Sequence, residues 1–237
     1  MSADTITVYG HNLVEEIMGQ WSFSELTFAA LAEGRRPTPE QARMIDVLLT
    51  TFMDHGVTPS SLVTRLTLLG APEAMQGAIA AGLNGAGSRY LGTMQVAGEM
   101  LQAAWQNRSE GEDRNAVARR IVAEHRAERR QLAGLGHPEH KNGDPRTPKL
   151  MSIARETGIA GPHCDLLFAV ADAWEAATGR MLPINAAGLS GAIVVDMGLS
   201  PIAGRGLAVV SRAAGLVGIV LSEIRTPTAQ AIWDQLR

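Results

Sequence analysis

The sequence carries its most specific pattern in two neighbouring stretches, Gly134-Leu135-Gly136-His137 and Asp144-Pro145-Arg146. Glycines two positions apart allow tight bends and let a backbone approach a ligand closely. The imidazole of His137 can titrate near neutral pH, and the guanidinium of Arg146 offers a planar fork to a carboxylate or phosphate. The pattern therefore predicts a loop that binds an anion.

Three further stretches accompany this loop. They are Asp54-His55-Gly56 before it, Asn185-Ala186-Ala187-Gly188 after it, and Ser211-Arg212-Ala213-Ala214-Gly215 near the end of the chain. Arg212 lies in an otherwise apolar segment, where an unpaired charge costs several kcal/mol. We therefore expect a carboxylate, from this protein or from a ligand, to meet Arg212.

Length and composition indicate a globular protein. The 237 residues are 46% hydrophobic and 19% charged, enough for a sizeable core in one domain or in two closely joined domains. The longest apolar stretch, residues 206–221, contains Arg212 and several glycines, so we interpret it as a buried helix and expect no membrane span. Residues 1–10 lack the pattern of an export signal, and the single cysteine, Cys164, cannot form an internal disulfide; both features favour the cytoplasm.

Charge argues against a dedicated nucleic-acid-binding protein, because the formal net charge is −3. One stretch is locally basic; its arginines are Arg119, Arg120, Arg126, Arg129 and Arg130. Such a helix either holds phosphates, of a cofactor or of DNA or RNA, or forms a solvated face paired with Glu124 and Glu128. Cys164 has no partner at a recognised metal-ligand spacing, so we expect no metal site.

Helix-forming residues dominate and no strand-like alternation persists, so we predict a nearly all-α fold. The clearest helix starts at Thr38-Pro39-Glu40-Gln41, with a capping threonine, a proline in the first helical position and a glutamine that closes a capping box. Apolar residues at helical spacing continue to Phe52, and Gly56 ends the helix. His55 is thereby placed at a helix C-terminus.

Similar starts at residues 58–61 and 71–73 predict short helices up to about residue 85. A polar segment, residues 106–113, separates them from the arginine-rich helix and is a candidate lid hinge. Further helices are expected over residues 148–156, 163–178, 185–197, 204–225 and 228–236.

These stretches resemble the citrate synthase superfamily, and most closely its short citryl-CoA lyase branch and the lyase module of ATP-citrate lyase. The likeness runs nearly end to end: residues 10–16, 21–23 and 34–38 match the family's N-terminal helices, and residues 134–146 are the most specific part.

The resemblance implies a citrate synthase-like helical fold. It implies a large domain over about residues 1–92 and 190–237 and a small CoA-binding lid over about residues 93–189. It also implies a homodimer or higher homo-oligomer, with a CoA thioester and a polycarboxylate as substrates, no permanently bound cofactor, and no nucleic-acid or membrane partner.

The resemblance assigns roles to five residues on the polycarboxylate side of the site. His137 matches the histidine that hydrogen-bonds the keto or hydroxyl oxygen at the reacting carbon, where a proton must move as the C–C bond breaks. His55, Arg146 and Arg212 match residues that hold substrate carboxylates, a role that suits a rigid bidentate fork. Arg225 matches an arginine that the family lends across the dimer interface.

The CoA side of the site is implied by the glycine-rich loop. Lys141 matches a basic residue on a CoA phosphate, and the backbone of Leu135, Gly136 and Pro138 is expected to flank the adenine.

Two positions depart from the family of synthases. Ala187 stands where an aspartate handles the α-proton of the acetyl group, and alanine cannot transfer a proton. Tyr90 stands where synthases have a histidine, although the ATP-citrate lyase module also has an aromatic residue there; its hydroxyl can donate a hydrogen bond to an enolate oxygen. Asp196 follows Ala187 within an expected helix, and we interpret it as structural.

The leading functional prediction is a lyase that cleaves citryl-CoA, or a related 3-hydroxy-3-carboxyacyl-CoA, to acetyl-CoA and oxaloacetate. The short chain and the pair Arg89-Tyr90 favour it over a full citrate synthase. Alternatives are a synthase-type acyltransferase that condenses acetyl-CoA with a keto acid, and a non-catalytic homologue that binds acyl-CoA or citrate, which Ala187 favours. A nucleic-acid-binding helix is the weakest alternative and predicts steeply salt-dependent binding to DNA or RNA.

Overall fold

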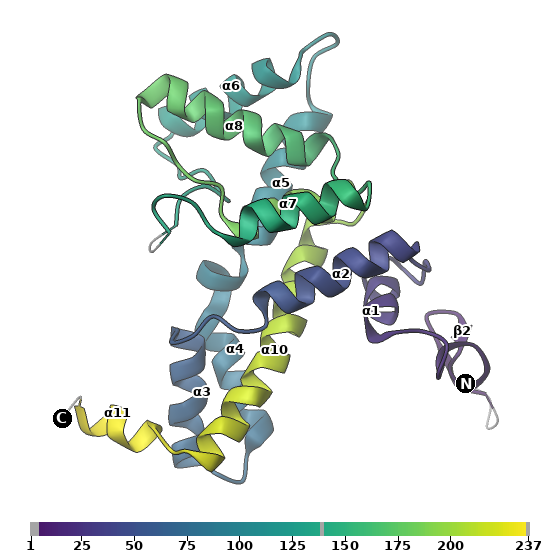
Figure 1. Ribbon diagram of the computed structural model, residues 1–237, viewed down its shortest axis with the longest axis vertical. Helices are drawn as coiled ribbons and strands as arrows, with labels where there is room; N and C mark the ends of the chain where they lie inside the picture. The colour runs from purple at the N-terminus through teal and green to yellow at the C-terminus, as the bar shows by residue number, and fades with distance from the viewer. Residues whose placement is uncertain (1–4, 138–139, 236–237) are drawn as a thin grey trace. The chain divides into compact units, whose positions relative to one another are not determined.

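The computed structural model describes residues 5–137 and 140–235, and it is nearly all helical, which confirms the predicted fold class (Figure 1). Its elements are β1 (Thr7–Val8), β2 (His11–Asn12), the π-helix η1 (Leu13–Ile17), α1 (Phe23–Leu31), α2 (Pro39–Phe52), α3 (Pro59–Gly70), α4 (Met75–Leu91), α5 (Thr93–Gln106), α6 (Arg114–Ala127), α7 (Arg146–Glu156), α8 (Pro162–Thr178), α9 (Ala186–Asp196), α10 (Pro201–Arg225) and α11 (Ala229–Gln235). The helices predicted over the second half of the chain are present, with ends that differ by a few residues from the predicted ones.

The chain divides into two compact units. The first unit comprises Met1–Val47 and Met94–Gly204, and the second comprises Leu48–Thr93 and Arg205–Arg237. Helices α2 and α10 contribute residues to both units. This division follows contacts within the chain and does not test the predicted large domain and lid, which stay predictions.

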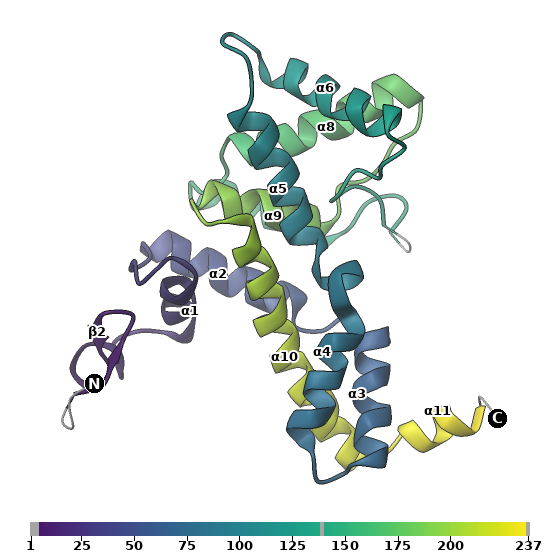
Figure 2. The same ribbon diagram turned by 180° about the vertical axis from the view of Figure 1, so that it is seen from behind.

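Helices α6 to α9 form the core of the first unit. Helix α8 packs against both α6 and α9, and α7 packs against α9, as Figures 1 and 2 show. Helix α9 is apolar on nearly all sides and almost entirely buried, as expected of a central helix. The large side chains buried here include Ile121, Leu150, Leu166, Leu167, Leu189 and Ile193.

Asp196, the last residue of α9, holds the first turn of α8. Its carboxylate accepts hydrogen bonds from the backbone N–H groups of Gly161, His163 and Cys164 at 2.9, 3.1 and 2.9 Å, and from Nδ1 of His163 at 2.7 Å. These bonds satisfy N–H groups that the start of a helix leaves unpaired. Asp196 therefore has the structural role expected of it, and Cys164 is fully buried, which raises the pKa of its thiol.

The loop around Gly134 meets the start of α9 with no side chain between the two backbones. Gly134 has a φ of +85°, and a Cβ atom there would lie 2.6 Å from the Cα atom of Gly188. A Cβ atom on Gly188 would lie 2.3 Å from the Cα atom of Gly134. The backbone N–H of Gly136 donates to the carbonyl of Pro183 at 2.7 Å, and that of Asn185 donates to the carbonyl of Gly134 at 3.0 Å. The paired glycines therefore permit this close approach.

Helices α3 and α4 pack side by side in the second unit, and α11 packs against α3 (Figure 1). Gly82 of α4 makes this packing close, because a Cβ atom there would lie 1.9 Å from Oγ1 of Thr64 on α3. The buried carboxylate of Glu223 on α10 accepts the backbone N–H of Thr228 at 2.6 Å and forms an ion pair with Arg65. This network joins α3, α10 and the start of α11.

Helix α10 is buried on one side only. Leu207 and Leu216 are buried, whereas Val217, Leu221 and Ile224 are exposed. Within the single chain, the predicted buried helix is therefore buried on one side only. Within the described residues, α10 alone is long and apolar enough to cross a membrane by length and composition, with 39% of its most apolar window buried, and core helices of soluble proteins pass the same test.

A short β-hairpin near the N-terminus is absent from the sequence predictions. Strands β1 and β2 pair antiparallel, and the turn between them is Tyr9-Gly10, with φ values of 51° and 86°. Two successive residues with positive φ are typical of a tight hairpin turn. Strands of two residues are too short to produce a readable alternation of apolar and polar side chains.

Replacing Gly188 with alanine is expected to destabilise the protein by about 1–3 kcal/mol, because the added methyl group overlaps the backbone of Gly134. Thermal unfolding of Gly188→Ala measures this loss. Gly77→Ala is the matched control, since Gly77 is an exposed position of α4 whose added Cβ atom meets only Ala74 at 3.5 Å. The control is expected to leave the melting temperature unchanged or slightly raised; equal losses in both variants would contradict the assignment.

Candidate active site

The predicted site residues fall into two sets, one in each unit, and the first set surrounds Asp144. This residue lies just before α7 and is 2% exposed. Its carboxylate accepts hydrogen bonds from the backbone N–H, Nε and Nη2 of Arg146 at 3.0, 2.9 and 2.8 Å, and from the backbone N–H of Ala186 at 2.9 Å. Asp144 therefore orients the Arg146 guanidinium and ties the loop to the start of α9.

These contacts keep Asp144 ionised. Burial by itself raises the pKa of the carboxyl group, but hydrogen bonds from Arg146 and from the backbone of Ala186 outweigh burial and lower the pKa from 3.8 to about 2. At neutral pH the site thus contains a permanent carboxylate–guanidinium pair.

The glycine-rich loop is fixed against the segment that leads into α9. Leu135 forms an isolated antiparallel β-bridge with Ile184, and Nδ2 of Asn185 donates to the carbonyl of Gly136 at 2.8 Å. The backbone of Leu135 and Gly136, which is expected to flank the adenine, is therefore held in place by the residues that lead into α9. Lys141 is exposed, and Pro138 lies outside the described residues.

The ring of His137 has a defined tautomer when it is neutral. The backbone N–H of His140 donates to Nδ1 of His137 at 3.1 Å, and the two imidazole rings pack with centroids 4.4 Å apart. Since Nδ1 accepts a hydrogen bond, the single proton of the neutral ring resides on Nε2. His137 therefore presents a hydrogen-bond donor at Nε2.

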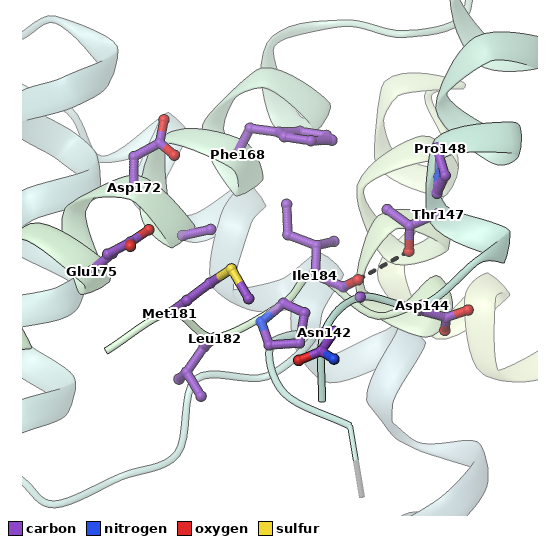
Figure 3. A pocket seen from close by; sticks show the side chains of 13 residues that line it. Asn142, Asp144, Thr147, Pro148, Phe168, Asp172, Glu175, Met181, Leu182 and Ile184 are labelled. Carbon is purple, nitrogen blue, oxygen red and sulfur yellow. Dashed lines mark hydrogen bonds between the residues drawn. The ribbon is translucent and has the colours of Figure 1, made fainter. Parts of the chain in front are cut away.

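A cavity of about 300 Å³ opens beside this loop, between α7, α8 and the segment before α9 (Figure 3). Phe168 and Met181 contribute to its apolar wall, while Asp144, Asp172 and Glu175 contribute carboxylates. Of the predicted site residues that the structure describes, none lines this cavity, and the negative charge of the lining is unfavourable to a phosphate.

The second set of predicted residues begins where α2 ends. Asp54 caps the turn that follows, because its Oδ1 accepts the backbone N–H groups of His55 at 2.7 Å and Gly56 at 3.1 Å. His55 itself is exposed, at the helix end where the sequence predicts it.

Arg212 is buried in α10, with 7% of its surface exposed. Its Nε and Nη1 atoms have no hydrogen-bond partner in the part of the chain that the structure describes. The nearest carboxylate, Oδ1 of Asp54, lies 4.0 Å from Nη1, and the Asp54 side chain is 71% exposed. Burial lowers the pKa of Arg212, and the charge of Asp54 offsets this effect only in part. We expected a carboxylate of the protein or of a ligand beside Arg212, and the protein itself supplies only the distant carboxylate of Asp54.

Tyr90 lies after a break in α4. Gly87 interrupts the helix with φ 51° and ψ −159°, and the Tyr90 side chain that follows is 54% exposed. The guanidinium of Arg89 lies 5.9 Å from the centre of the Tyr90 ring. Arg225, the last residue of α10, is exposed.

The chain as a whole matches a known family. A family model described as citrate synthase, C-terminal domain, matches residues 5–232. The chain belongs to the citrate synthase family.

Solved structures with the same fold include the citryl-CoA lyase from Hydrogenobacter thermophilus, with 30% identity and a TM-score of 0.85 over 94% of this chain and 84% of that chain. ATP citrate lyase from Methanothrix soehngenii, in complex with citrate and coenzyme A, is 21% identical, with a TM-score of 0.76 over 94% of this chain and 38% of that chain. Citrate synthase from Pyrobaculum aerophilum is 24% identical, with a TM-score of 0.63 over 87% and 50%. The last two likenesses show the fold alone. A comparison with curated proteins gives no match.

Within this citrate synthase-family fold, Ala187 occupies the first turn of α9, immediately after the residue whose N–H binds Asp144. The carboxylate of Asp144 is engaged by Arg146, and that of Asp196 is engaged by the start of α8. Neither is therefore a ready substitute for the family aspartate.

The arginines of α6 and its C-terminal end mostly meet partners within the first unit. Arg114 pairs with Asp165, Arg120 with Glu112, and Arg126 donates to a backbone carbonyl of α8. These contacts favour the solvated, ion-paired face among the alternatives that the sequence leaves open. Among the described residues, no group of three or more histidine, cysteine, aspartate or glutamate side chains is arranged to hold a metal ion.

Asp144 is expected to make stability depend on pH. Its folded pKa of about 2 lies below the ordinary 3.8, so ionisation stabilises the fold; this contribution is fully present above about pH 4 and is lost as the pH falls to about 2. The difference corresponds to about 2 kcal/mol.

Urea unfolding of the wild type and Asp144→Asn at pH 6 and pH 3 tests this expectation. The variant is expected to be less stable at pH 6 and to lose less stability on acidification. Asp234→Asn, at an exposed position of α11, is the control and should follow the wild type. Parallel pH profiles for the wild type and Asp144→Asn would contradict the role assigned to Asp144.

Proposed function

We propose that this protein is a citryl-CoA lyase-like enzyme that cleaves citryl-CoA, or a related 3-hydroxy-3-carboxyacyl-CoA, to acetyl-CoA and oxaloacetate. The observation that carries the proposal is the buried guanidinium of Arg212, whose Nε and Nη1 lack hydrogen-bond partners within the described chain and whose nearest carboxylate, on the exposed Asp54, is 4.0 Å away. A buried charge of this kind is stabilised by an anionic ligand. Citryl-CoA lyase from Hydrogenobacter thermophilus, at 30% identity, is the supporting comparison.

The polycarboxylate is held, in this proposal, by His55, Arg146 and Arg212. Arg146 suits the role because Asp144 already fixes its guanidinium, so little side-chain entropy is lost when a carboxylate binds. Arg225 contributes from a partner subunit of a homodimer.

The loop around Leu135 and Gly136 holds the CoA portion, with Pro138 beside the adenine and Lys141 at a phosphate. The exposed ammonium group of Lys141 is free to move toward such an anion. We place the enzyme in the cytoplasm, with a CoA-binding lid over about residues 93–189.

His137 acts on the oxygen of the reacting carbon. As the C–C bond of citryl-CoA breaks, the hydroxyl proton leaves to solvent, the electrons on the oxygen form the keto group of oxaloacetate, and the electron pair of the C–C bond passes to the acetyl-CoA enolate. With its proton on Nε2, the neutral ring of His137 donates a hydrogen bond to that oxygen and stabilises the negative charge on it during this step. Tyr90 supplies the corresponding donor to the thioester enolate. Either solvent or Tyr90 provides the proton that the family aspartate otherwise handles, since Ala187 cannot.

A binding protein without catalysis is the second candidate, because Ala187 removes a proton-transfer group and losing such a group costs about 10²- to 10⁴-fold in rate. A synthase-type condensation of acetyl-CoA with a keto acid uses the same residues in the opposite direction. The two directions are distinguished by whether citryl-CoA or acetyl-CoA plus a keto acid is consumed.

Purified protein mixed with citryl-CoA is expected to release oxaloacetate. A coupled malate dehydrogenase reaction measures this release. His137→Ala is expected to lower turnover about 10²- to 10⁴-fold because it removes the donor to the reacting oxygen. Arg43→Gln, an exposed substitution on α2, controls for nonspecific effects and should retain wild-type turnover. Calorimetric binding of CoA thioesters without any product would overturn the lyase proposal in favour of the binding role.

Ala187→Asp is expected to raise turnover about tenfold or more, because it restores a carboxylate at the position of the family's proton-transfer residue. Ala187→Ser controls for added size and polarity without a comparable base. A similar effect of both substitutions, or none with Ala187→Asp, would show that another group already carries out proton transfer.

A further inference from the structure

Tyr90 lies on a short turn that a break separates from the rest of α4. Gly87 has φ 51° and ψ −159°, a backbone conformation that is essentially restricted to glycine. The backbone N–H of Gly92 donates to the carbonyl of Ser88 at 3.0 Å, so residues 88–92, the Tyr90 turn, close a helical turn of their own. Because the helix is interrupted at Gly87, the hydrogen bonds of α4 alone do not fix the direction in which the Tyr90 turn points.

Arg205, in the first turns of α10, meets both ends of the Tyr90 turn. Its Nη1 donates to Oγ of Ser88 at 3.2 Å. At the other end, a Cβ atom added to Gly92 would lie 2.8 Å from Nη2 of Arg205, so the guanidinium lies directly against the backbone of this buried glycine. Arg205 and the Tyr90 turn belong to the same compact unit. The guanidinium therefore spans the turn from its first residue to its last.

The hydrogen bonding of Arg205 is poor for an arginine that stabilises the fold. In the part of the chain that the structure describes, its buried Nε has no hydrogen-bond partner. An unpaired buried donor opposes folding, and a single hydrogen bond to an exposed serine does not outweigh that effect. Stability therefore does not explain the position of this guanidinium, whereas control of the Tyr90 turn does.

The position of the Tyr90 hydroxyl decides whether it can act in the proposed reaction. A donor to a developing enolate oxygen is effective only when it is held in place before the charge appears. Misplacement by about 1 Å can cost about 10²-fold in rate. The Tyr90 side chain is 54% exposed, and the Arg89 guanidinium lies 5.9 Å from the centre of its ring, so the ring has little packing of its own. Its place is therefore set mainly through the backbone that carries it.

We propose that Arg205 is a positioning residue for Tyr90, an inference that rests on the proposed function. Its guanidinium holds the Tyr90 turn at Ser88 and Gly92 and thereby aims the hydroxyl at the thioester oxygen of the enolate. Arg205 itself touches neither the substrate nor the reacting atoms. Loss of its contacts leaves the turn free to rotate about Gly87, so the hydroxyl is in place for only part of the time.

Fluorine NMR of protein labelled with 3-fluorotyrosine tests the positioning directly. The sequence has two tyrosines, Tyr9 and Tyr90, so each gives its own signal, and Tyr90→Phe assigns them. Arg205→Met removes the donors and keeps an unbranched side chain. It is expected to move the Tyr90 signal toward that of free 3-fluorotyrosine and to leave the Tyr9 signal, from the other compact unit, unchanged.

Three further variants separate the hydrogen bond from other effects in the same NMR experiment. Ser88→Ala removes the acceptor at an exposed position and is expected to shift the Tyr90 signal in the same direction by a smaller amount. Arg205→Lys retains a donor for Ser88 and is expected to stay close to the wild type. Arg43→Met, on an exposed face of α2, is the matched control for loss of an arginine and should change neither signal.

Turnover of citryl-CoA provides the second readout. Arg205→Met is expected to lower kcat about 10- to 100-fold and to change KM by less than about twofold, because the residues proposed to bind the polycarboxylate are untouched. In the Tyr90→Phe background the same substitution is expected to change kcat by less than about twofold, since the hydroxyl that it positions is already absent. Arg205→Lys should restore most of kcat.

An unchanged Tyr90 signal in Arg205→Met would overturn the proposal, as would equal losses of kcat in the wild-type and Tyr90→Phe backgrounds. Where Arg205→Met alters both fluorine signals through unfolding, Ser88→Ala decides instead, and an unchanged Tyr90 signal in that variant overturns the proposal. Absence of citryl-CoA turnover in the wild type would overturn the lyase function and leave the fluorine signals as the test of Arg205, so the two failures are distinguishable.

Discussion

The hydrogen-bonded carboxylate of Asp144 is the interaction on which the organisation of the first unit's site depends. It accepts three hydrogen bonds from Arg146 and one from Ala186, so one buried group connects the loop, α7 and α9. A buried carboxylate is costly unless it is fully hydrogen-bonded, and this requirement leaves the surrounding backbone few alternative positions. The orientation of the Arg146 guanidinium follows from the same constraint.

The two arginines assigned to substrate carboxylates differ in how the protein supports them. Arg146 has an internal carboxylate partner and is ordered before any ligand arrives. Arg212 has only the distant, exposed carboxylate of Asp54 as a partner. Burial of the Arg212 guanidinium therefore opposes folding and favours the binding of an anionic ligand. Among the residues proposed to bind substrate carboxylates, Arg212 therefore lowers the stability of the fold, whereas Arg146 does not.

Much of the fold was predictable because helix signals are local. The cap and proline at Thr58 and Pro59 begin α3, and the amphipathic run after Pro39 forms α2. The β-hairpin was not predictable, since strands of two residues carry no period. The position of Asp144 within its motif signalled a functional loop, but its bond to Ala186 joins residues 42 apart in sequence, which no local pattern encodes.

The candidate site was predictable to a smaller extent. The family motif names His137 and Arg146, whereas their surroundings depend on tertiary structure: the tautomer of His137 is set by the backbone of His140. His163 shows the same dependence on tertiary structure, because its imidazole pairs with Asp196, 33 residues away in sequence, and its side chain is only 13% exposed.

The contact between Gly134 and Gly188 has a consequence for how this family diverges. Each position requires glycine because an added Cβ atom would overlap the backbone of the other residue, and no substitution at that other residue can remove its backbone. The two positions are thus expected to vary little in any relative that keeps its loop against α9. A relative with a larger residue at either position must carry that loop farther from the helix, and its ligand pocket will have a different outline.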